Sequence, residues 1–151
     1  MRRLWPGILL LGCLGLAVAG GGIEVRDAWV REGPPTASAL AGYLVIENAG
    51  DTAAAVTGAT SPQFDQVEFH ETVIEQGMAR MVPRARLEIP PGGRLHLAPG
   101  GVHLMLIGPR RVLKDGDRVR LDLTLESGER IALTLPVRRT LDAPPHHHHA
   151  H

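Results

Sequence analysis

Short runs of alternating hydrophobic and polar residues fill the chain from Ile23 onward, separated by glycine, proline, asparagine and aspartate. Successive side chains of a β-strand point to opposite faces, so this alternation predicts half-buried strands. No long stretch shows the 3.6-residue period of an amphipathic helix. The pattern predicts strands at residues 23–31, 39–48, 53–59, 66–74, 78–83, 86–89, 94–97, 102–107, 118–126 and 130–137.

The clearest predicted hairpin lies near the end of the chain. Residues 118–126 alternate, Ser127-Gly128 forms a turn, and the alternation resumes over 130–137. Many short strands joined by such turns are typical of a sandwich of two antiparallel sheets with Greek-key connections. We therefore expect an all-β, Greek-key β-sandwich.

The first nineteen residues have the features of a secretory signal peptide. Arg2-Arg3 is followed by a mostly apolar stretch, and Ala17-Val18-Ala19 is a small-residue cleavage site. An alternative interpretation takes Leu10-Leu11-Gly12-Cys13 as a lipoprotein processing site, which would leave Cys13 acylated at a new N-terminus. Either route predicts a protein in the periplasm or another extracytoplasmic space.

The total length of 151 residues fits one domain with a short additional segment at each terminus. We expect a signal peptide at 1–19, one domain at 20–139 and a flexible histidine-rich tail at 140–151. The sixteen basic and sixteen acidic side chains balance, which argues against nucleic acid as a partner. We expect a monomer.

Cysteine usage restricts the chemistry of any metal site. Cys13 is the only cysteine, so cleavage after Ala19 leaves a mature chain without thiols. A metal site in such a chain must be built without thiolate.

Residues able to bind a soft metal are concentrated between His70 and Met105. Outside Met1 and the C-terminal histidine run, every Met and His of the chain lies there. The spacing is His70, ten residues, Met81, twenty-one residues, His103, one residue, Met105. In a strand, His103 and Met105 share a face. A four-residue loop at 74–77 would place His70 directly opposite Met81.

Thioether sulfur is a soft, neutral donor that suits Cu(I), whereas Zn(II) prefers thiolate, imidazole and carboxylate. A blue-copper site requires a cysteine, which the mature chain lacks. We therefore predict one Cu(I) bound by two imidazoles and two thioethers, in an exposed site typical of a carrier rather than an enzyme. The predicted ligands are His70, Met81, His103 and Met105.

Two further residues of the same types need separate treatment. His96 alternates with Leu95 and Leu97 and should face solvent, so we leave it out of the site. Met78 would replace Met81 as a ligand if the hairpin register shifted by one residue.

The same residues resemble the periplasmic copper chaperones for the CuA centre, the PCuAC family. The family motif is His, ten residues, Met, twenty-one residues, His, one residue, Met, and this chain matches it at every spacing. Flanking segments also agree, among them Asp27-Ala28-Trp29, Ala41-Gly42-Tyr43-Leu44 and Val67-Glu68-Phe69-His70-Glu71. The resemblance implies a cupredoxin-like sandwich that delivers Cu(I) to the CuA centre of cytochrome c oxidase subunit II. It also implies a thioredoxin-like copper-site assembly protein as a further partner.

Other functions are compatible with the same pattern. One is a copper-binding redox or storage protein, and another is a secreted β-sandwich interaction domain that binds no metal. The tail adds a second expectation, because histidine-rich segments bind Cu(II). A second Cu(II) site is expected at His146–His149 and His151, unless this segment is an engineered tag.

Overall fold

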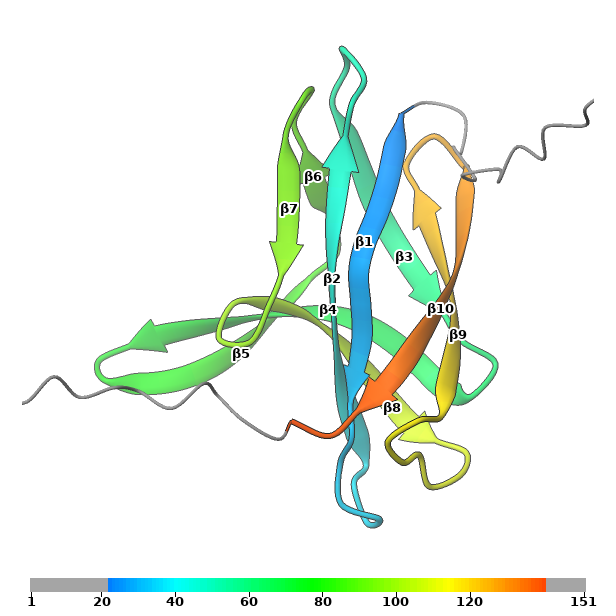
Figure 1. The fold of residues 1–151 in the computed structure, drawn as a ribbon. Coiled ribbons are helices and arrows are strands. Elements are labelled where there is room, and N and C mark those ends of the chain that lie inside the picture. Colours follow the sequence, from blue (N-terminus) through cyan, green and yellow to red (C-terminus); the bar gives the residue numbers. More distant parts are fainter. Residues whose placement is uncertain (1–21, 141–151) are drawn as a thin grey trace, which may run out of the picture.

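The structure is a computed structural model that describes residues 22–140. All regular structure in this range is β-strand (Figure 1). The strands are β1 (Ile23–Arg31), β2 (Ala39–Asn48), β3 (Ala54–Thr60), β4 (Phe64–Glu75), β5 (Met78–Arg84), β6 (Leu87–Ile89), β7 (Arg94–Leu97), β8 (Val102–Pro109), β9 (Arg118–Leu125) and β10 (Arg130–Arg138). Each predicted strand is present, and its ends differ from the prediction by no more than two residues.

Three predictions fall outside the described residues: the signal peptide, the acylation of Cys13 and the Cu(II)-binding tail. Within the described range, no helix is long and apolar enough to cross a membrane.

The strands form one sheet that closes on itself. The order is β5-β4-β8-β2-β1-β10-β9-β3-β6, and an additional β3–β4 pairing at Ala59 and Val67 closes the ring between the strands next to the two ends of this path. β7 pairs with β2 outside the closed ring. The predicted all-β, Greek-key fold is confirmed, and the two layers of the sandwich are opposite walls of this barrel-like sheet.

The core lies inside this barrel and consists mainly of aliphatic side chains that alternate along each strand. Leu121 and Leu123 of β9 are fully buried, as are Leu104 and Leu106 of β8. Burying a side chain of this size contributes roughly 1.5–3 kcal/mol to folding. The inward faces of these strands are the faces that the sequence pattern predicts.

The β4–β5 hairpin projects sideways from the barrel (Figure 1). Glu75 pairs with Met78, so the turn consists of Gln76 and Gly77 alone, with φ angles of 51° and 77°. Positive φ at both central residues is the signature of a type I′ turn, whose twist matches that of the flanking strands. The predicted four-residue loop at 74–77 is therefore wrong.

A bulge in β1 determines which face of the sheet the side chains in the second half of this strand occupy. Register with β2 shifts between Arg26 and Trp29, and Asp27 has a φ of 51° there. The extra residue places Trp29 opposite Tyr43, with ring centroids 4.9 Å apart. Because a slip of one residue moves side chains to the other face of a sheet, the bulge brings Trp29 beside Tyr43.

Candidate metal centre

His70 and His103 face each other on neighbouring strands. In the antiparallel β4–β8 pair, His70 lies opposite His103, and Glu68 lies opposite Met105. Side chains directly opposite one another share a face. Leu104, between the two predicted β8 ligands, points into the core, so both ligands lie on the other face. The two imidazole centroids are 6.3 Å apart, and the ring planes are inclined by 52°.

Met81 does not pair with His70 as predicted. It lies opposite Thr72, and His70 lies opposite Pro83. The error is two residues, because the hairpin turn contains two residues rather than four. A shift of two residues preserves the face of each side chain. Met81 therefore remains on the same face as His70, one pair of residues further along the hairpin.

Three of the four predicted ligands line one pocket of about 330 Å³: Met81, His103 and Met105. His70 is not part of this lining, and it joins the group through its position beside His103. The remaining lining residues are Arg31, Ala39, Leu40, Ala41, Tyr43, Thr72, Pro99 and Gly100. Strands far apart in the sequence thus bring one imidazole and two thioethers to a common space, with the second imidazole adjacent.

One wall of the pocket carries a positive charge. The guanidinium carbon of Arg31 lies 5.9 Å from the ring centroid of Tyr43, within the range of a cation–π contact. Tyr43 itself is buried, with 6% of its surface exposed. The aromatic ring and the guanidinium therefore form one side of the pocket.

Each histidine has one ring nitrogen held by a hydrogen bond. His103 Nδ1 lies 3.1 Å from the carbonyl oxygen of Gly101, which can only accept. His70 Nε2 lies 2.7 Å from the carboxylate of Glu68. His70 Nδ1 is buried and has no hydrogen-bond partner. A buried polar atom without a partner is rare in folded proteins and calls for an explanation such as an ion.

The spacing of the two rings is compatible with a shared ion. Imidazole nitrogens bind metals at about 2.0 Å, so two rings that share one ion have centroids up to roughly 6 Å apart. The observed 6.3 Å is close to that limit. With two thioethers nearby, the donor set is soft and neutral, which suits Cu(I) better than Zn(II).

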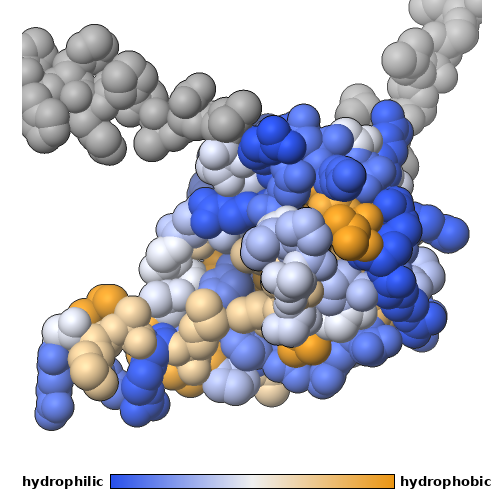
Figure 2. All heavy atoms as spheres, turned by 90° about the horizontal axis from the view of Figure 1, so that it is seen from below, coloured by the Kyte–Doolittle hydropathy of each residue, from blue (hydrophilic) through white to orange (hydrophobic). Residues whose placement is uncertain are grey.

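Exposure increases from one side of the candidate site to the other. His103 is 5% exposed, whereas Met81 on the hairpin is 56% exposed. Figure 2 shows hydrophobic side chains along the arm that projects from the body of the molecule, where Ile74 and Met78 are also exposed. The site is therefore anchored in the barrel on one side and open to solvent on the other.

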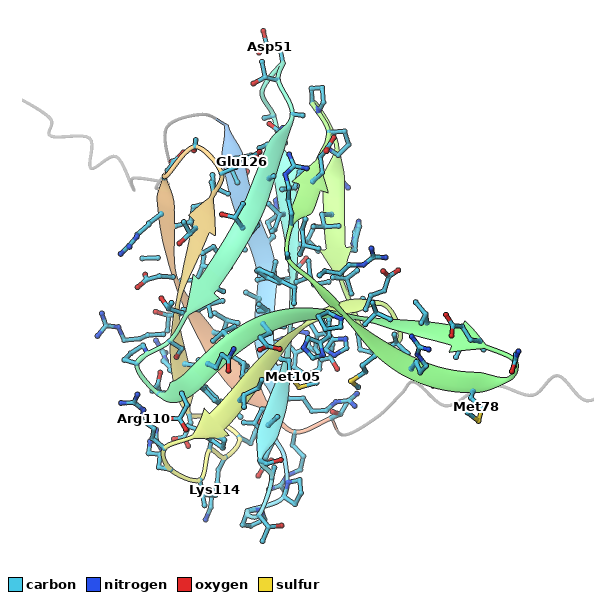
Figure 3. The ribbon with its side chains drawn as sticks, turned by 180° about the vertical axis from the view of Figure 1, so that it is seen from behind. Asp51, Met78, Met105, Arg110, Lys114 and Glu126 are labelled. Atoms are coloured by element: carbon cyan, nitrogen blue, oxygen red, sulfur yellow. The ribbon has the colours of Figure 1, made fainter. Side chains whose placement is uncertain are left out.

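The structure also separates Met78 and His96 from the candidate site. Met78 pairs with Glu75. Met78 is three positions from Met81 on the same strand, and an odd spacing places it on the other face of the hairpin. It sits at the far end of the hairpin, well away from Met105 (Figure 3). His96 on β7 pairs with Val45 of β2 and is exposed, as predicted.

Glu68 was missed in the sequence prediction. Its position two residues before His70 on one strand places both side chains on the same face, and this spacing could have revealed the contact. Among residues 22–140, no three His, Cys, Asp or Glu side chains gather in a group that could hold a metal. The donors at this site are instead imidazoles and thioethers.

Comparison with known sequences identifies related chains. A family model described as "LpqE-like: Putative lipoprotein LpqE-like" matches residues 23–137. A relative from Leifsonia xyli subsp. xyli (strain CTCB07), named "Putative lipoprotein Lxx21020", is 33% identical over 150 residues. The match covers 91% of this chain and 89% of the relative.

Solved structures share the fold. The copper-bound PCuAC domain from PmoF2 superimposes with a TM-score of 0.68 at 22% identity, covering 81% of this chain and 97% of that domain. Apo-DR1885 from Deinococcus radiodurans is 28% identical with a TM-score of 0.63, covering 93% of this chain and 95% of its own. The Cu(I) form of DR1885 has a TM-score of 0.60 at 28% identity, with 78% of each chain covered.

Proposed function

This chain belongs to the LpqE-like family, and we propose that it is an extracytoplasmic copper(I) chaperone. It binds one Cu(I) through His70, Met81, His103 and Met105 and passes the ion to a partner. The family description and the apolar leader with its cleavage site support a location outside the cytoplasm.

The observation that carries the proposal is the convergence of soft, neutral donors from separate strands. Met81, His103 and Met105 line one pocket, and His70 lies beside His103. Thioether sulfur stabilises Cu(I) in preference to harder ions. DR1885, which is similar over most of its length, has been solved as a Cu(I) complex.

The exposure of Met81 supports a carrier rather than an enzyme or a storage protein. A ligand on a solvent-exposed hairpin can be replaced by a ligand from a partner without unfolding the barrel. Catalysis by a metal needs an open coordination position together with a base or a redox-competent ligand set. The ligand set proposed here serves to hold and release an ion.

We propose the CuA centre of cytochrome c oxidase subunit II as the recipient, with a thioredoxin-like copper-site assembly protein as a further partner. The PCuAC motif of this chain supports this recipient. The tail residues His146–His149 and His151 provide a second site, for Cu(II), because several imidazoles in one short segment bind that ion well.

The test is a competition titration of Cu(I) against a chromophoric chelator, with the mature chain and a chain cut after Pro145. We expect both to bind one Cu(I) tightly, and Met81→Ala/Met105→Ala to lose this binding. Met78→Ala is the matched control, since it removes another exposed thioether, from the other face of the same hairpin.

Tight binding that survives the double substitution would contradict the proposed site. A parallel titration with Cu(II) tests the tail. Only the uncut chain should bind an additional equivalent, and equal Cu(II) uptake by the cut chain would exclude a tail site.

A further inference from the structure

Glu68 is held at both carboxylate oxygens by side chains of its own strand. His70 Nε2 lies 2.7 Å from one oxygen, and the side-chain amide of Gln66 donates to the other at 2.6 Å. The three residues alternate along β4, so their side chains form a row on one face. On the neighbouring strand β8, Met105 lies directly opposite Glu68.

This contact determines which nitrogen of His70 is free. A neutral imidazole carries its proton on one nitrogen and a lone pair on the other. An ionised carboxylate can only accept a hydrogen bond, so His70 Nε2 must carry the proton. The lone pair is then on Nδ1, the buried atom without a partner.

The carboxylate is also close enough to influence a bound cation. Within the described part of the chain, His70 is the only cationic or potentially cationic side chain within 4.0 Å of the Glu68 carboxylate. The side chain of Glu68 is 34% exposed and that of His70 is 16% exposed, so water screens the charge only in part. Neutral imidazole and thioether ligands leave the charge of Cu(I) uncompensated. Glu68, whose carboxylate lies 2.7 Å from His70 Nε2, supplies the opposite charge.

We propose that Glu68 is a positioning residue of the copper site, which holds His70 as the Nε2–H tautomer and thereby selects Nδ1 as the copper-binding atom. This inference rests on the proposed function. It follows a general pattern in which a histidine ligand donates its second N–H to a carboxylate, which fixes the ring and makes the ligand more basic.

Three variants of the full mature chain test the proposal. Glu68→Ala removes the acceptor and the charge, whereas Glu68→Gln keeps an acceptor oxygen without the charge. Glu71→Gln is the matched control, because Glu71 lies on the other face of β4 and pairs with Arg84.

The first measurement is long-range ¹H–¹⁵N NMR of the histidine rings in the copper-free protein, which identifies the protonated nitrogen. Wild-type, Glu68→Gln and Glu71→Gln proteins should show His70 as Nε2–H, and Glu68→Ala should show a mixture of tautomers. A residue that only packs against its neighbours would not move this signal. His70 protonated on Nδ1 in the wild type would overturn the proposal.

The second measurement is Cu(I) affinity together with the ¹⁵N shifts of the Cu(I)-loaded protein. Glu68→Ala should bind Cu(I) about 10–100-fold more weakly, the usual effect of losing such a partner. Glu68→Gln should recover part of that loss, and Glu71→Gln should match the wild type. On loading, the Nδ1 shift of His70 should change. A copper-induced change at Nε2 instead, or wild-type affinity in Glu68→Ala, would overturn the proposal.

The two readouts separate this inference from the proposed function. If the wild type binds no Cu(I) but the Nε2–H tautomer of His70 depends on Glu68, the copper function is wrong. The positioning of His70 by Glu68 is then still supported. If Cu(I) binds as expected but the tautomer does not depend on Glu68, the copper function stands and the positioning role is wrong.

Discussion

At the scale of residues, the candidate site depends on which face of a strand each side chain occupies. His103 and Met105 share a face because they are two positions apart, and Leu104 between them is in the core. His103 Nδ1 is held by the Gly101 carbonyl, which leaves Nε2 as its free nitrogen. The same alternation on β7 directs His96 to solvent, away from the pocket.

A pair of matched substitutions tests this assignment of histidines. His103→Gln should weaken Cu(I) binding by at least about tenfold, since it replaces an imidazole with an amide that binds soft metals poorly. His96→Gln makes the same chemical change outside the pocket and should leave affinity unchanged. Chelator competition measures both affinities, and thermal unfolding verifies that each variant is folded. Equal losses in the two variants would contradict the assignment.

At the scale of elements, the β4–β5 hairpin determines where Met81 lies. Among the strands of residues 22–140, β5 pairs with β4 alone, so its geometry depends on that pairing and on the turn at Gln76 and Gly77. Gly77 has a φ of 77°, and an added Cβ would meet no other atom there. A substitution at this position therefore costs free energy through the strained backbone conformation and not through steric crowding.

Gly77→Val should distort the hairpin and weaken Cu(I) binding through Met81. A β-branched residue at positive φ costs roughly 1–2 kcal/mol, and the edge hairpin can relieve this strain by opening locally. We expect a several-fold loss of affinity with little change in the unfolding temperature of the barrel.

Gly128→Val is the control for this experiment. Gly128 has a φ of 90°, open space around it and a place in the β9–β10 turn, away from the pocket. The Gly128→Val variant should have a lower unfolding temperature and an unchanged Cu(I) affinity. Hairpin geometry would have no part in binding if Gly77→Val bound Cu(I) like the wild type.

At the scale of the whole molecule, the site lies on the side of a closed barrel where one hairpin extends beyond it (Figure 1). The barrel wall supplies His103 and Met105, and the projecting arm supplies Met81. Such an arrangement combines a rigid half of the site with an accessible half. It suits a protein that must both retain an ion and present it to a partner.

The family of this chain is described as a lipoprotein family, which favours the alternative processing of the leader before Cys13 and predicts a lipid anchor on that residue. The protein expressed with its leader should then fractionate with membranes and carry an acyl group on Cys13. Cys13→Ser removes the only cysteine and should release the protein into the soluble extracytoplasmic fraction. Membrane fractionation and mass spectrometry of the N-terminus measure both outcomes. A wild-type protein that begins at Gly20 without lipid would contradict the tether.

The sequence by itself determined the strands, their inward faces and the spacing of the soft donors. These features depend on local periodicity, which each strand carries in its own residues. The face shared by His103 and Met105, and the exposure of His96, followed from alternation alone.

Tertiary structure decided how those faces meet. The two-residue turn at Gln76 and Gly77 shifts the hairpin register by two residues from the predicted one, so that Met81 lies opposite Thr72 instead of His70. Pairing of β4 with β8 places His70 opposite His103, although thirty-two residues separate them in the sequence. Such pairings are stabilised by contacts between residues distant along the chain, which no local pattern encodes. For this reason the candidate ligands could be proposed from the sequence, whereas their arrangement around one pocket could not.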